Sequence, residues 1–600
     1  MKRLADGGRS RRSYPYCSLC MKLSAALPHI LSAARDDTVK RPEHVISMIK
    51  GENKMAPSSN SQWDATKRAN EETPLLNDLK DRQSHILPRK QLLVVFPALA
   101  LIHFTSFLDQ TALSTSLPAI AAGLNTGSSI SWVSASFLTT STSIQLINGR
   151  LSDIFGRKTC LLGALTIMAL GNLLSGWSQT PAQLYATRAF SGLGAGAINA
   201  LVQIAISDIT TLEQRGYYFG ILGVAVALGN GLGPVVGGVL TEKTSWRWAF
   251  WFVCPLAAAA ATYFGLVFPP SDMADNVCTK LQRVDWFGVF TSMMAIVLIL
   301  IPVSQGGSAI PWNSPIIIAM LALGAVLFGL FLIGEWRWVK LPLLPMRLFK
   351  YNYSTNILLA VNILIGWVFW GNLFYIPLYF QNVRGWSPGT AGSLILPMVI
   401  AHGITSGLTG LIISWTGRYK VVISTGVGMW MIAAAAKSFY TQQTPLWILE
   451  LGGIFEGIGV GCSFQPVMVG LLAGSDKSDR AVVTGFRNFI RDMGGSVGVT
   501  VSGAILNNVL HNDLKGRFSE ELISKITSSA FALYDFNLTD EDQELISNAY
   551  MHGLRTVFTV FAVLILLFFV LSLCIKDYGL AGRARIESRE QVERERYTDE

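Results

Sequence analysis

Charged residues stand inside apolar stretches of this sequence, where they could do chemistry that a membrane otherwise forbids. Asp109, Arg188 and Glu456 each lie within an otherwise apolar run. A charge surrounded by lipid is costly, so such residues pair with one another or bind ions and protons. Asp109 and Glu456 could take up protons, and Arg188 could hold a nearby carboxylate in its charged form. For Glu456 the competing interpretation is a carboxylic acid that burial keeps neutral.

The composition around these residues predicts a polytopic membrane protein. Of the 600 residues, 50% are hydrophobic and only 14% are charged, which is too apolar for a soluble protein of this length. The formal net charge of +9 comes from Lys and Arg in the tails and in short loops between apolar runs. Basic residues in that arrangement orient a chain in a membrane, so we expect no nucleic-acid partner.

We predict an all-α integral membrane protein with fourteen transmembrane helices, from the alternation of apolar runs and short polar breaks. Alternate loops carry the basic clusters, among them Arg150, Arg157 and Lys158, which places both termini in the cytosol. The predicted spans are 92–118, 130–149, 159–177, 184–206, 217–240, 248–268, 286–304, 315–335, 354–376, 390–413, 421–440, 446–471, 489–510 and 553–575.

These spans divide the chain into five segments. Residues 1–87 are polar and form a disordered cytosolic tail, residues 88–270 a first six-helix half, and residues 271–350 two additional central helices. Residues 351–577 form a second six-helix half with an outer loop at 511–552, and residues 578–600 a second cytosolic tail.

Counting residues along the spans places Asp109 and Arg188 at one depth. Asp109 lies roughly 25 Å from the inner face and Arg188 roughly 8 Å from the outer face of a hydrocarbon core about 30 Å thick. The two side chains could therefore form one buried pair, in which Asp109 takes up a proton when Arg188 moves away. The alternative is a static structural ion pair.

A charged decapeptide, GRLSDIFGRK at residues 149–158, separates the second and third spans. We predict a tight cytosolic turn at Gly149 and Gly156. Twenty residues of helix carry the chain from Arg188 to Asp208 at the same inner face. Asp153, Arg157 and Asp208 are thus expected to form a charge cluster that holds an inner gate, although these charges could serve only to orient the chain.

Several motifs resemble those of the fourteen-span drug:proton antiporters of the major facilitator superfamily, particularly fungal members. GRLSDIFGRK matches the loop signature after the second span, and a degenerate copy, GLIISWTGRYK at residues 410–420, follows the tenth span without the Asp. The resemblance covers about residues 90–577 and implies two parallel six-helix halves with two extra helices between them. The other motifs are LDQTALSTSLP (108–118), RAFSGLGAG (188–196), GNGLGPVVGG (229–238), SWRWAFWF (245–252) and FRNFIRDMGGSVG (486–498).

The resemblance also implies roles for some residues. It assigns Arg188 to proton transfer and identifies GNGLGPVVGG as the antiporter motif, with Gly229, Gly233, Gly237 and Gly238 allowing close helix contact and Pro234 bending the helix. We expect the substrate cavity to collect polar and aromatic side chains from several spans, each of which could instead serve packing: Gln145, Gln203, Trp367, Trp370, Asn372, Tyr375, Tyr379, Gln465 and Glu456, with His402 as a further ionisable residue.

Three short patterns lie outside the spans. Asn537 begins a sequon on the outer loop and is expected to be glycosylated, whereas the sequon at Asn352 is on the cytosolic side and is expected to be unused. The segment EETPLL, from Glu71 to Leu76, fits an acidic dileucine sorting signal of endosomal and vacuolar membranes. A lone CxxC at Cys17 and Cys20 lacks the second ligand pair of a zinc site, so no metal site is expected.

Together these features predict a secondary transporter and not an enzyme. GRLSDIFGRKT fails the phosphate-loop spacing, and the glycines near residues 192 and 229 follow no strand, so neither ATP nor a dinucleotide is implied. We expect a monomer that exchanges protons for a drug, toxin or secondary metabolite, driven by the proton gradient without a cofactor. It would lie in the plasma membrane, or in the vacuolar membrane if the dileucine signal operates. The alternatives are a vacuolar basic amino-acid transporter of the same fold and a non-transporting membrane sensor or scaffold.

Overall fold

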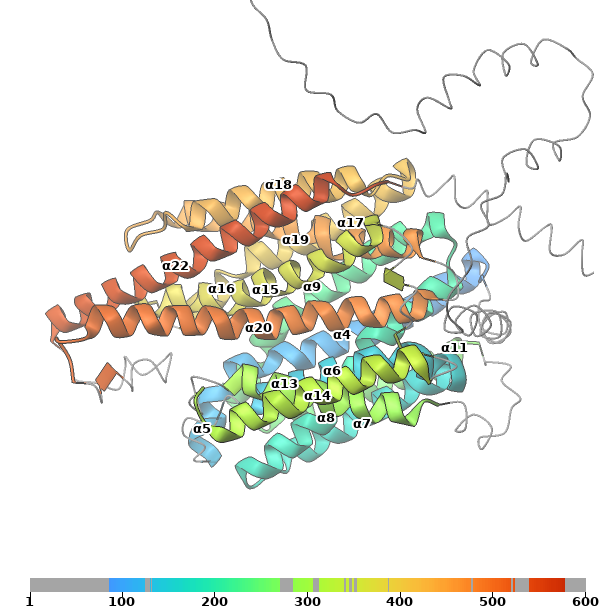
Figure 1. Cartoon of the computed structure of the whole chain (residues 1–600), viewed down its shortest axis with the longest axis horizontal. Coiled ribbons are helices and arrows are strands. Elements are labelled where there is room, and N and C mark those ends of the chain that lie inside the picture. Colours follow the sequence, from blue (N-terminus) through green and yellow to red (C-terminus); the bar gives the residue numbers. More distant parts are fainter. Residues whose placement is uncertain are drawn as a thin grey trace, which may run out of the picture. The chain divides into compact units, whose positions relative to one another are not determined.

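The computed structural model describes residues 86–124, 130, 132–269, 284–305, 312–338, 342–344, 348–349, 353–386, 388–475, 479–519, 522–523 and 539–577. They all belong to one compact unit, residues 68–600. Every regular element among them is a helix (Figure 1). Cys17, Cys20, Glu71 to Leu76, Asn352 and Asn537 lie outside the described residues.

The first half consists of long helices that follow the predicted spans, with short helices at some of their ends. Ser, Thr and Pro residues start several of them: Thr180 caps α8 through the backbone N–H of Gln183, and Pro181 is its first residue. The elements are α4 (Arg89–Ala112), η1 (Leu113–Thr115), α5 (Leu117–Leu124), α6 (Trp132–Phe155), α7 (Arg157–Gly176), α8 (Pro181–Ile209), α9 (Leu212–Lys243), α10 (Trp248–Trp251) and α11 (Val253–Val267).

Two further helices, α13 (Trp286–Gln305) and α14 (Pro315–Arg337), pair with each other between the halves in sequence. The second half then repeats the pattern of the first. Its elements are α15 (Tyr353–Asn382), α16 (Pro388–Ser393), α17 (Leu396–Thr416), α18 (Lys420–Lys437), α19 (Leu446–Gly474), α20 (Arg480–Leu514) and α22 (Asp540–Leu573).

Thirteen helices among the described residues are long and apolar enough to cross a membrane. The helix at the second predicted span, α6, has 24 residues but is not one of the thirteen, because Ser, Thr, Gln, Asn, Arg and Asp interrupt it. Those polar side chains are mostly buried, since α6 packs against α8 and α20. The architecture is thus consistent with fourteen spans, one of which is shielded from lipid by its neighbours.

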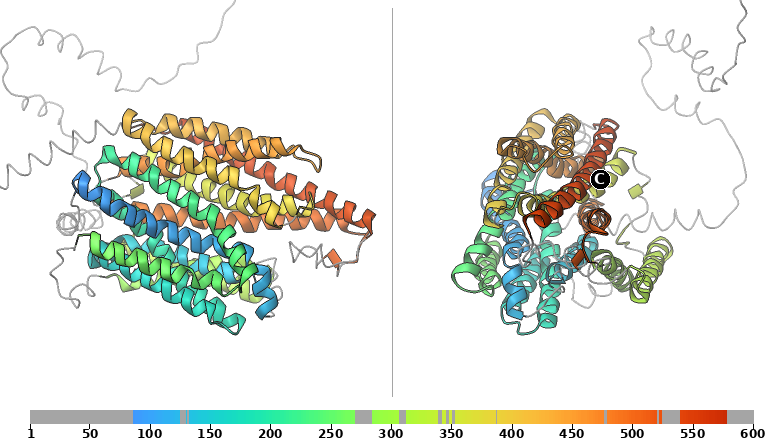
Figure 2. Two further views of the ribbon diagram at one scale, coloured as in Figure 1. Left: turned by 180° about the vertical axis from the view of Figure 1, so that it is seen from behind. Right: turned by 90° about the vertical axis from the view of Figure 1, so that its left-hand side faces the viewer.

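The two halves each pack internally and then meet through a few helices. Within the halves α6 and α7 lie against α8, and α18 lies against α19. Between the halves α9 packs on α17 and α19, while α20 packs on α6 and α8. The views from behind and from one side also show α22 and α18 together, away from the first-half helices (Figure 2). Helix α13 contacts both α6 and α20, so the extra helix pair lies beside this junction.

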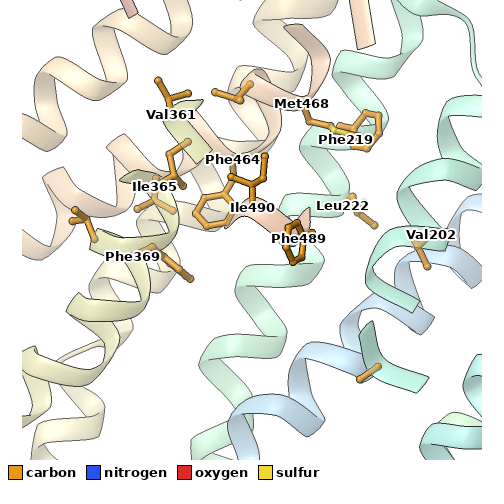
Figure 3. Packing of buried hydrophobic residues seen from close by; sticks show 14 of the residues in the cluster. Val202, Phe219, Leu222, Val361, Ile365, Phe369, Phe464, Met468, Phe489 and Ile490 are labelled. Carbon is orange, nitrogen blue, oxygen red and sulfur yellow. The ribbon is translucent and has the colours of Figure 1, made fainter. Parts of the chain in front are cut away.

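Buried hydrophobic side chains join the halves into one core. Val361, Ile365 and Phe369 form one stripe along α15. The same cluster includes Phe219 and Leu222 of α9. Figure 3 shows both groups, together with side chains of α8, α19 and α20. Because one buried cluster includes side chains of α9 and of the second half, the two halves share a packed hydrophobic interface.

Three predicted boundaries differ from the structure. The decapeptide 149–158 is not a turn throughout: α6 continues to Phe155, and only Gly156, with φ of 90°, breaks the helix. Helix α20 begins at Arg480 rather than 489, because its polar first turns are buried against other helices. The predicted outer loop 511–552 is shorter, since α22 begins at Asp540 after the Thr539 cap.

Candidate functional site

The buried charge pair lies between α4 and α8. Arg188 Nη1 donates to Asp109 Oδ1 and to Asn172 Oδ1, each at 3.2 Å, and neither charged side chain is more than 1% exposed. The guanidinium carbon lies 4.2 Å from the centre of the Phe137 ring. The other carboxylate oxygen, Asp109 Oδ2, is buried and has no hydrogen-bond partner among the described residues. The residues that depth counting placed at one level are therefore in contact, with one acceptor left unsatisfied.

The glycine-rich motif GNGLGPVVGG (229–238) holds α4 against α9. A Cβ built on Gly233 would lie 2.0 Å from Thr111 Oγ1, and one on Gly237 would lie 2.0 Å from the carbonyl oxygen of Ala112. Gly229 also faces α4, whereas Gly238 has only ordinary contacts around it. Pro234 lies within the continuous helix α9, and its carbonyl accepts a hydrogen bond from Thr115. The motif thus fixes the position of the helix that carries Asp109.

At the other end of the first half, three charged residues form a cluster. Arg157 Nε donates to Asp208 Oδ2 at 2.9 Å, and Arg157 Nη2 donates to Asp153 Oδ1 at 2.6 Å. Arg157 Nη1 also reaches Ser152. We call this end of the bundle, where α6 meets α7, the inner end; the predicted orientation places it in the cytosol. The three members of the cluster lie on α6, α7 and α8, so the cluster itself stays within one half.

Contact between the halves at the inner end comes from Gly149 and Arg150, which precede Asp153 on α6; Arg150 also lies 3.6 Å from Asp153. Arg150 lies 3.8 Å from Asp479, the residue before α20, and its Nε donates to the carbonyl of Pro342 at 2.9 Å. A Cβ on Gly149 would lie 2.9 Å from the carbonyl of Ala481, so glycine here allows a close helix crossing and not a turn. The sequence indicated Arg150 only as a topogenic charge and gave no sign of Asp479.

A polar group occupies the junction between α20 and the first half. Gln145 of α6 donates to Asp492 Oδ2 at 2.9 Å, and Asn488 donates to Gln203 of α8 at 3.4 Å. Arg491 pairs with Asp492 at 3.0 Å. These side chains repeat at helical spacing on the face of α20 that meets α6 and α8.

Arg487, on the same helix, is fully buried and donates only to neutral oxygens among the described residues. Its Nη2 donates to the carbonyl of Phe464 at 2.6 Å and its Nη1 to Asn488 Oδ1 at 2.9 Å. Its Nε has no partner there. Sequence reasoning left Arg487 outside the thirteenth span, which it began at residue 489, and it did not identify Arg491 and Asp492 as charges within the membrane although both lie inside that span. The polar residues of FRNFIRD, spaced three and four apart, could have indicated a helix face.

The structure separates the predicted cavity residues into four places. Gln145 and Gln203 lie at the α20 junction described above, and Gln465 is buried on α19 with an unpartnered carbonyl oxygen. Asn372 and Glu456 meet each other within the second half. The aromatic residues pack inside the second half: Trp367 donates to Ser502, Tyr375 to Val499, and Tyr379 to Thr441, while Trp370 lies against Gly495 and His402 against Phe464.

Comparisons with known proteins agree with this architecture. A family model described as Major Facilitator Superfamily matches residues 99–499. Citrate exporter 1 of Yarrowia lipolytica is 38% identical over 502 residues, covering 83% of this chain and 74% of that protein. Efflux pump dotC of Dothistroma septosporum is 32% identical, covering 70% and 73%, and efflux pump FUS6 of Gibberella moniliformis is 29% identical, covering 81% and 88%.

Two solved structures share the fold at low sequence identity. The human organic anion transporter MFSD10 (TETRAN) aligns with a TM-score of 0.56 at 15% identity, covering 81% of this chain and all of that one. The proton:xylose symporter XylE aligns with a TM-score of 0.54 at 13% identity, covering 82% and 97%. At this identity the likeness concerns the fold alone.

Proposed function

This chain belongs to the major facilitator superfamily and is related to fungal efflux pumps, and from that premise we propose that it exports a small organic molecule in exchange for protons. The observation that carries the proton coupling is the pair of Asp109 and Arg188, which is buried and leaves Asp109 Oδ2 without a partner. That oxygen is an available acceptor for a proton. Enzymatic activity has no part in this function.

The geometry suggests how a proton would act at this pair. Protonation of Asp109 removes its charge, so the attraction that holds Arg188 to it is lost. Arg188 then keeps Asn172 Oδ1 and the face of Phe137 as neighbours, which can hold the cation without a carboxylate. Because α4 carries Asp109 and also packs on α9, a change at the pair can be passed to the junction with the second half.

Alternating access requires that one end of the bundle opens while the other closes. The inner end is closed by Arg150 with Asp479 and by the crossing of Gly149 over Ala481. We propose that Asp153, Arg157 and Asp208 hold the helices of the first half together. The contact of Arg150 with Asp479 is then the one that breaks when the inner end opens.

For the cargo, the efflux-pump relatives favour a drug, toxin or secondary metabolite. A second candidate, an organic anion, is favoured by the buried Arg487, whose hydrogen bonds among the described residues all go to neutral oxygens. It is consistent with the relative named a citrate exporter. The basic amino-acid alternative fits less well, because a cationic cargo beside Arg487 would be repelled. Two like charges 4 Å apart at an effective dielectric constant of 20 repel by about 4 kcal/mol.

The membrane and the oligomeric state are further proposals. A multi-pass membrane location follows from the helices and the family. We propose the plasma membrane, with the vacuolar membrane as the alternative if the EETPLL segment is a sorting signal. We also propose that the chain works as a monomer.

The variant Asp109→Asn tests the proton coupling. Full-length protein in vesicles, given a pH gradient across the membrane, is expected to move radiolabelled citrate or a lipophilic dye, and Asp109→Asn is expected to lose the pH-driven part of that flux. The amide keeps the shape of the carboxylate but binds no proton. The measurement is initial flux with and without the gradient.

The matched control is Asp513→Asn, a carboxylate that pairs with His552 outside the buried site. It is expected to transport as the wild type does. If Asp109→Asn, inserted at normal levels, retains the full gradient-driven flux, Asp109 does not couple protons to transport. If wild-type protein moves neither citrate nor the dye, with or without the pH gradient, the non-transporting sensor or scaffold is the better description.

A further inference from the structure

The second half contains its own buried ion pair, which the proposed function has not used. Lys437 of α18 contacts a carboxylate oxygen of Glu456 on α19 and donates to Asn372 Oδ1 on α15 at 2.9 Å. Asn372 Nδ2 donates to the other carboxylate oxygen, and Trp430 Nε1 donates to that same oxygen at 3.3 Å. Lys437, Glu456 and Asn372 are at most 3% exposed.

This triad repeats the arrangement around Asp109 on the equivalent helices of the second half. In the first half the first, third and fourth long helices supply Asp109, Asn172 and Arg188. The corresponding helices α15, α18 and α19 supply the triad of the second half. Depth agrees as well: Asp109 lies 20 residues after Arg89, which begins α4, and Asn372 lies 19 residues after Tyr353, which begins α15.

The residue types, however, are exchanged between the helices. The carboxylate lies on the first helix of the first half but on the fourth helix of the second half. The amide lies on the third helix of the first half but on the first helix, α15, of the second half. Each site still holds one acid, one base and one Asn. A single proton therefore changes either site from neutral to a charge of plus one. The repeated chemistry, kept while its residues change places, argues that the charge itself is needed at both sites.

The surroundings give the triad room to respond. A small pocket is lined by Lys437, Asn372 and Tyr440 together with apolar side chains such as Leu373 and Phe558. A lysine released by its carboxylate could extend into this pocket, whereas a tightly enclosed pair could not rearrange.

Other titratable groups near Glu456 come from each packed element. Helix α17 brings His402, α15 brings Tyr379, and α22 brings Arg555, which donates to the carbonyl of Tyr440 at 3.0 Å. Glu450 lies earlier on α19 itself.

Helix α9 approaches α19 at Gln465, and α20 approaches it at Phe464, where Arg487 and Arg491 lie. Phe464 is eight residues from Glu456, about 12 Å along the helix. Lys437 is therefore the cation that directly opposes Glu456.

We propose that Glu456, held by Lys437 and Asn372, is a second proton-binding site, so that each half of the transporter carries one. A proton from the outer solution adds to a carboxylate oxygen of Glu456, Lys437 keeps its own proton, and the site gains one positive charge. Lys437 then retains Asn372 Oδ1 and turns toward the pocket. This inference rests on the proposed function, which it extends from one coupling proton to two.

Infrared difference spectra of the full-length protein in vesicles, recorded between neutral and acidic buffer, test the site without any transport. Protonated carboxyl groups give a distinct band. Wild-type protein is expected to show a contribution that Glu456→Gln removes and that Asp109→Asn leaves in place. Glu450→Gln, on the same helix, is the matched control and is expected to retain the Glu456 contribution.

A Glu456→Gln spectrum identical to that of the wild type overturns the proposal. Because this variant leaves Lys437 without its counterion and can fail to fold, Glu456→Gln with Lys437→Gln is measured alongside it. For the double variant we expect loss of the same band and about half as many protons moved per cargo molecule. A structural pair predicts an unchanged proton count, which also overturns the proposal. If Asp109→Asn transports normally, the proposed function fails. The infrared band of Glu456 still shows whether that residue binds a proton, because its measurement does not depend on transport.

Discussion

At the scale of single residues, the buried face of α20 bears on the proposal that the cargo is an anion. Arg487 is buried with neutral acceptors, and Arg491 pairs with Asp492. Two cations, Arg487 and Arg491, share the one carboxylate of Asp492, so an anionic ligand at this position would lower the cost of burying the second charge. Such a ligand would gain a charge-assisted hydrogen bond from Arg487.

We expect Arg487→Gln to weaken citrate transport with little effect on assembly. Loss of a hydrogen bond to a charged group costs roughly 1.5–3 kcal/mol, which corresponds to about tenfold or more in apparent affinity. The measurement is the concentration dependence of citrate uptake into inverted vesicles. Arg418→Gln, in the loop after α17, removes the same charge away from the junction and should leave the affinity unchanged. Equal affinities for both variants would exclude Arg487 as an anion contact.

At the scale of elements, α9 connects the two halves because it presents glycines in both directions. Gly233 and Gly237 allow α4 to approach on one side. Gly220, on the other side, lies against Gly410 of α17, where a built Cβ would be 2.8 Å from its Cα. Small residues at these crossings bring backbones together, which is how helices associate where lipid removes the hydrophobic driving force.

Two neighbouring glycines of α9 provide a sharp test of this packing. Gly237→Ala places a Cβ 2.0 Å from a backbone carbonyl that cannot move away, so we expect destabilisation of about 1–3 kcal/mol. Gly238→Ala meets nothing closer than 3.5 Å and should leave stability unchanged or slightly raised. Thermal unfolding in detergent, followed by loss of the monodisperse peak, separates the two. Similar midpoints for both variants would mean that α4 and α9 do not pack this closely.

At the scale of the whole molecule, the inner end is closed by a contact that also includes the extra helix pair. Arg150 reaches Asp479 before α20 and the carbonyl of Pro342 after α14. Helix α13 lies against both α6 and α20. We therefore propose that opening of the inner end separates Arg150 from Asp479 and shifts the α13–α14 pair together with one of the halves.

Asp479→Asn is expected to open the inner end more often. A cysteine placed at Ala481, which is buried against Gly149, reports this through its alkylation rate from the inner side in a protein whose own cysteines are replaced. We expect at least a fivefold faster reaction, a shift of about 1 kcal/mol in the opening equilibrium. Asp577→Asn, a carboxylate near Lys420 at the same end but within one half, is the control. An unchanged rate in Asp479→Asn would exclude this pair as a closure.

The sequence alone determined the helical membrane architecture, the family and the depth of the buried charges. Apolar runs of spanning length leave few other folds, because lipid offers no partners to the backbone. The rise per residue then placed Asp109 level with Arg188, and Arg157 level with Asp208, and each pair is in contact in the structure. Depth follows from counting along one helix, so it needs no knowledge of how helices pack.

Only the tertiary structure decided which helices face each other and how each helix is rotated about its own axis. That is why Arg150 was recognised as a loop charge but not as the contact to Asp479, and why Glu456 was recognised but Lys437 was not. It is also why the polar start of α20 was assigned to a loop, although α6 and α8 bury it. Contacts across the junction join residues hundreds of positions apart. Their energy depends on side-chain fit between helices, which no local pattern in the sequence records.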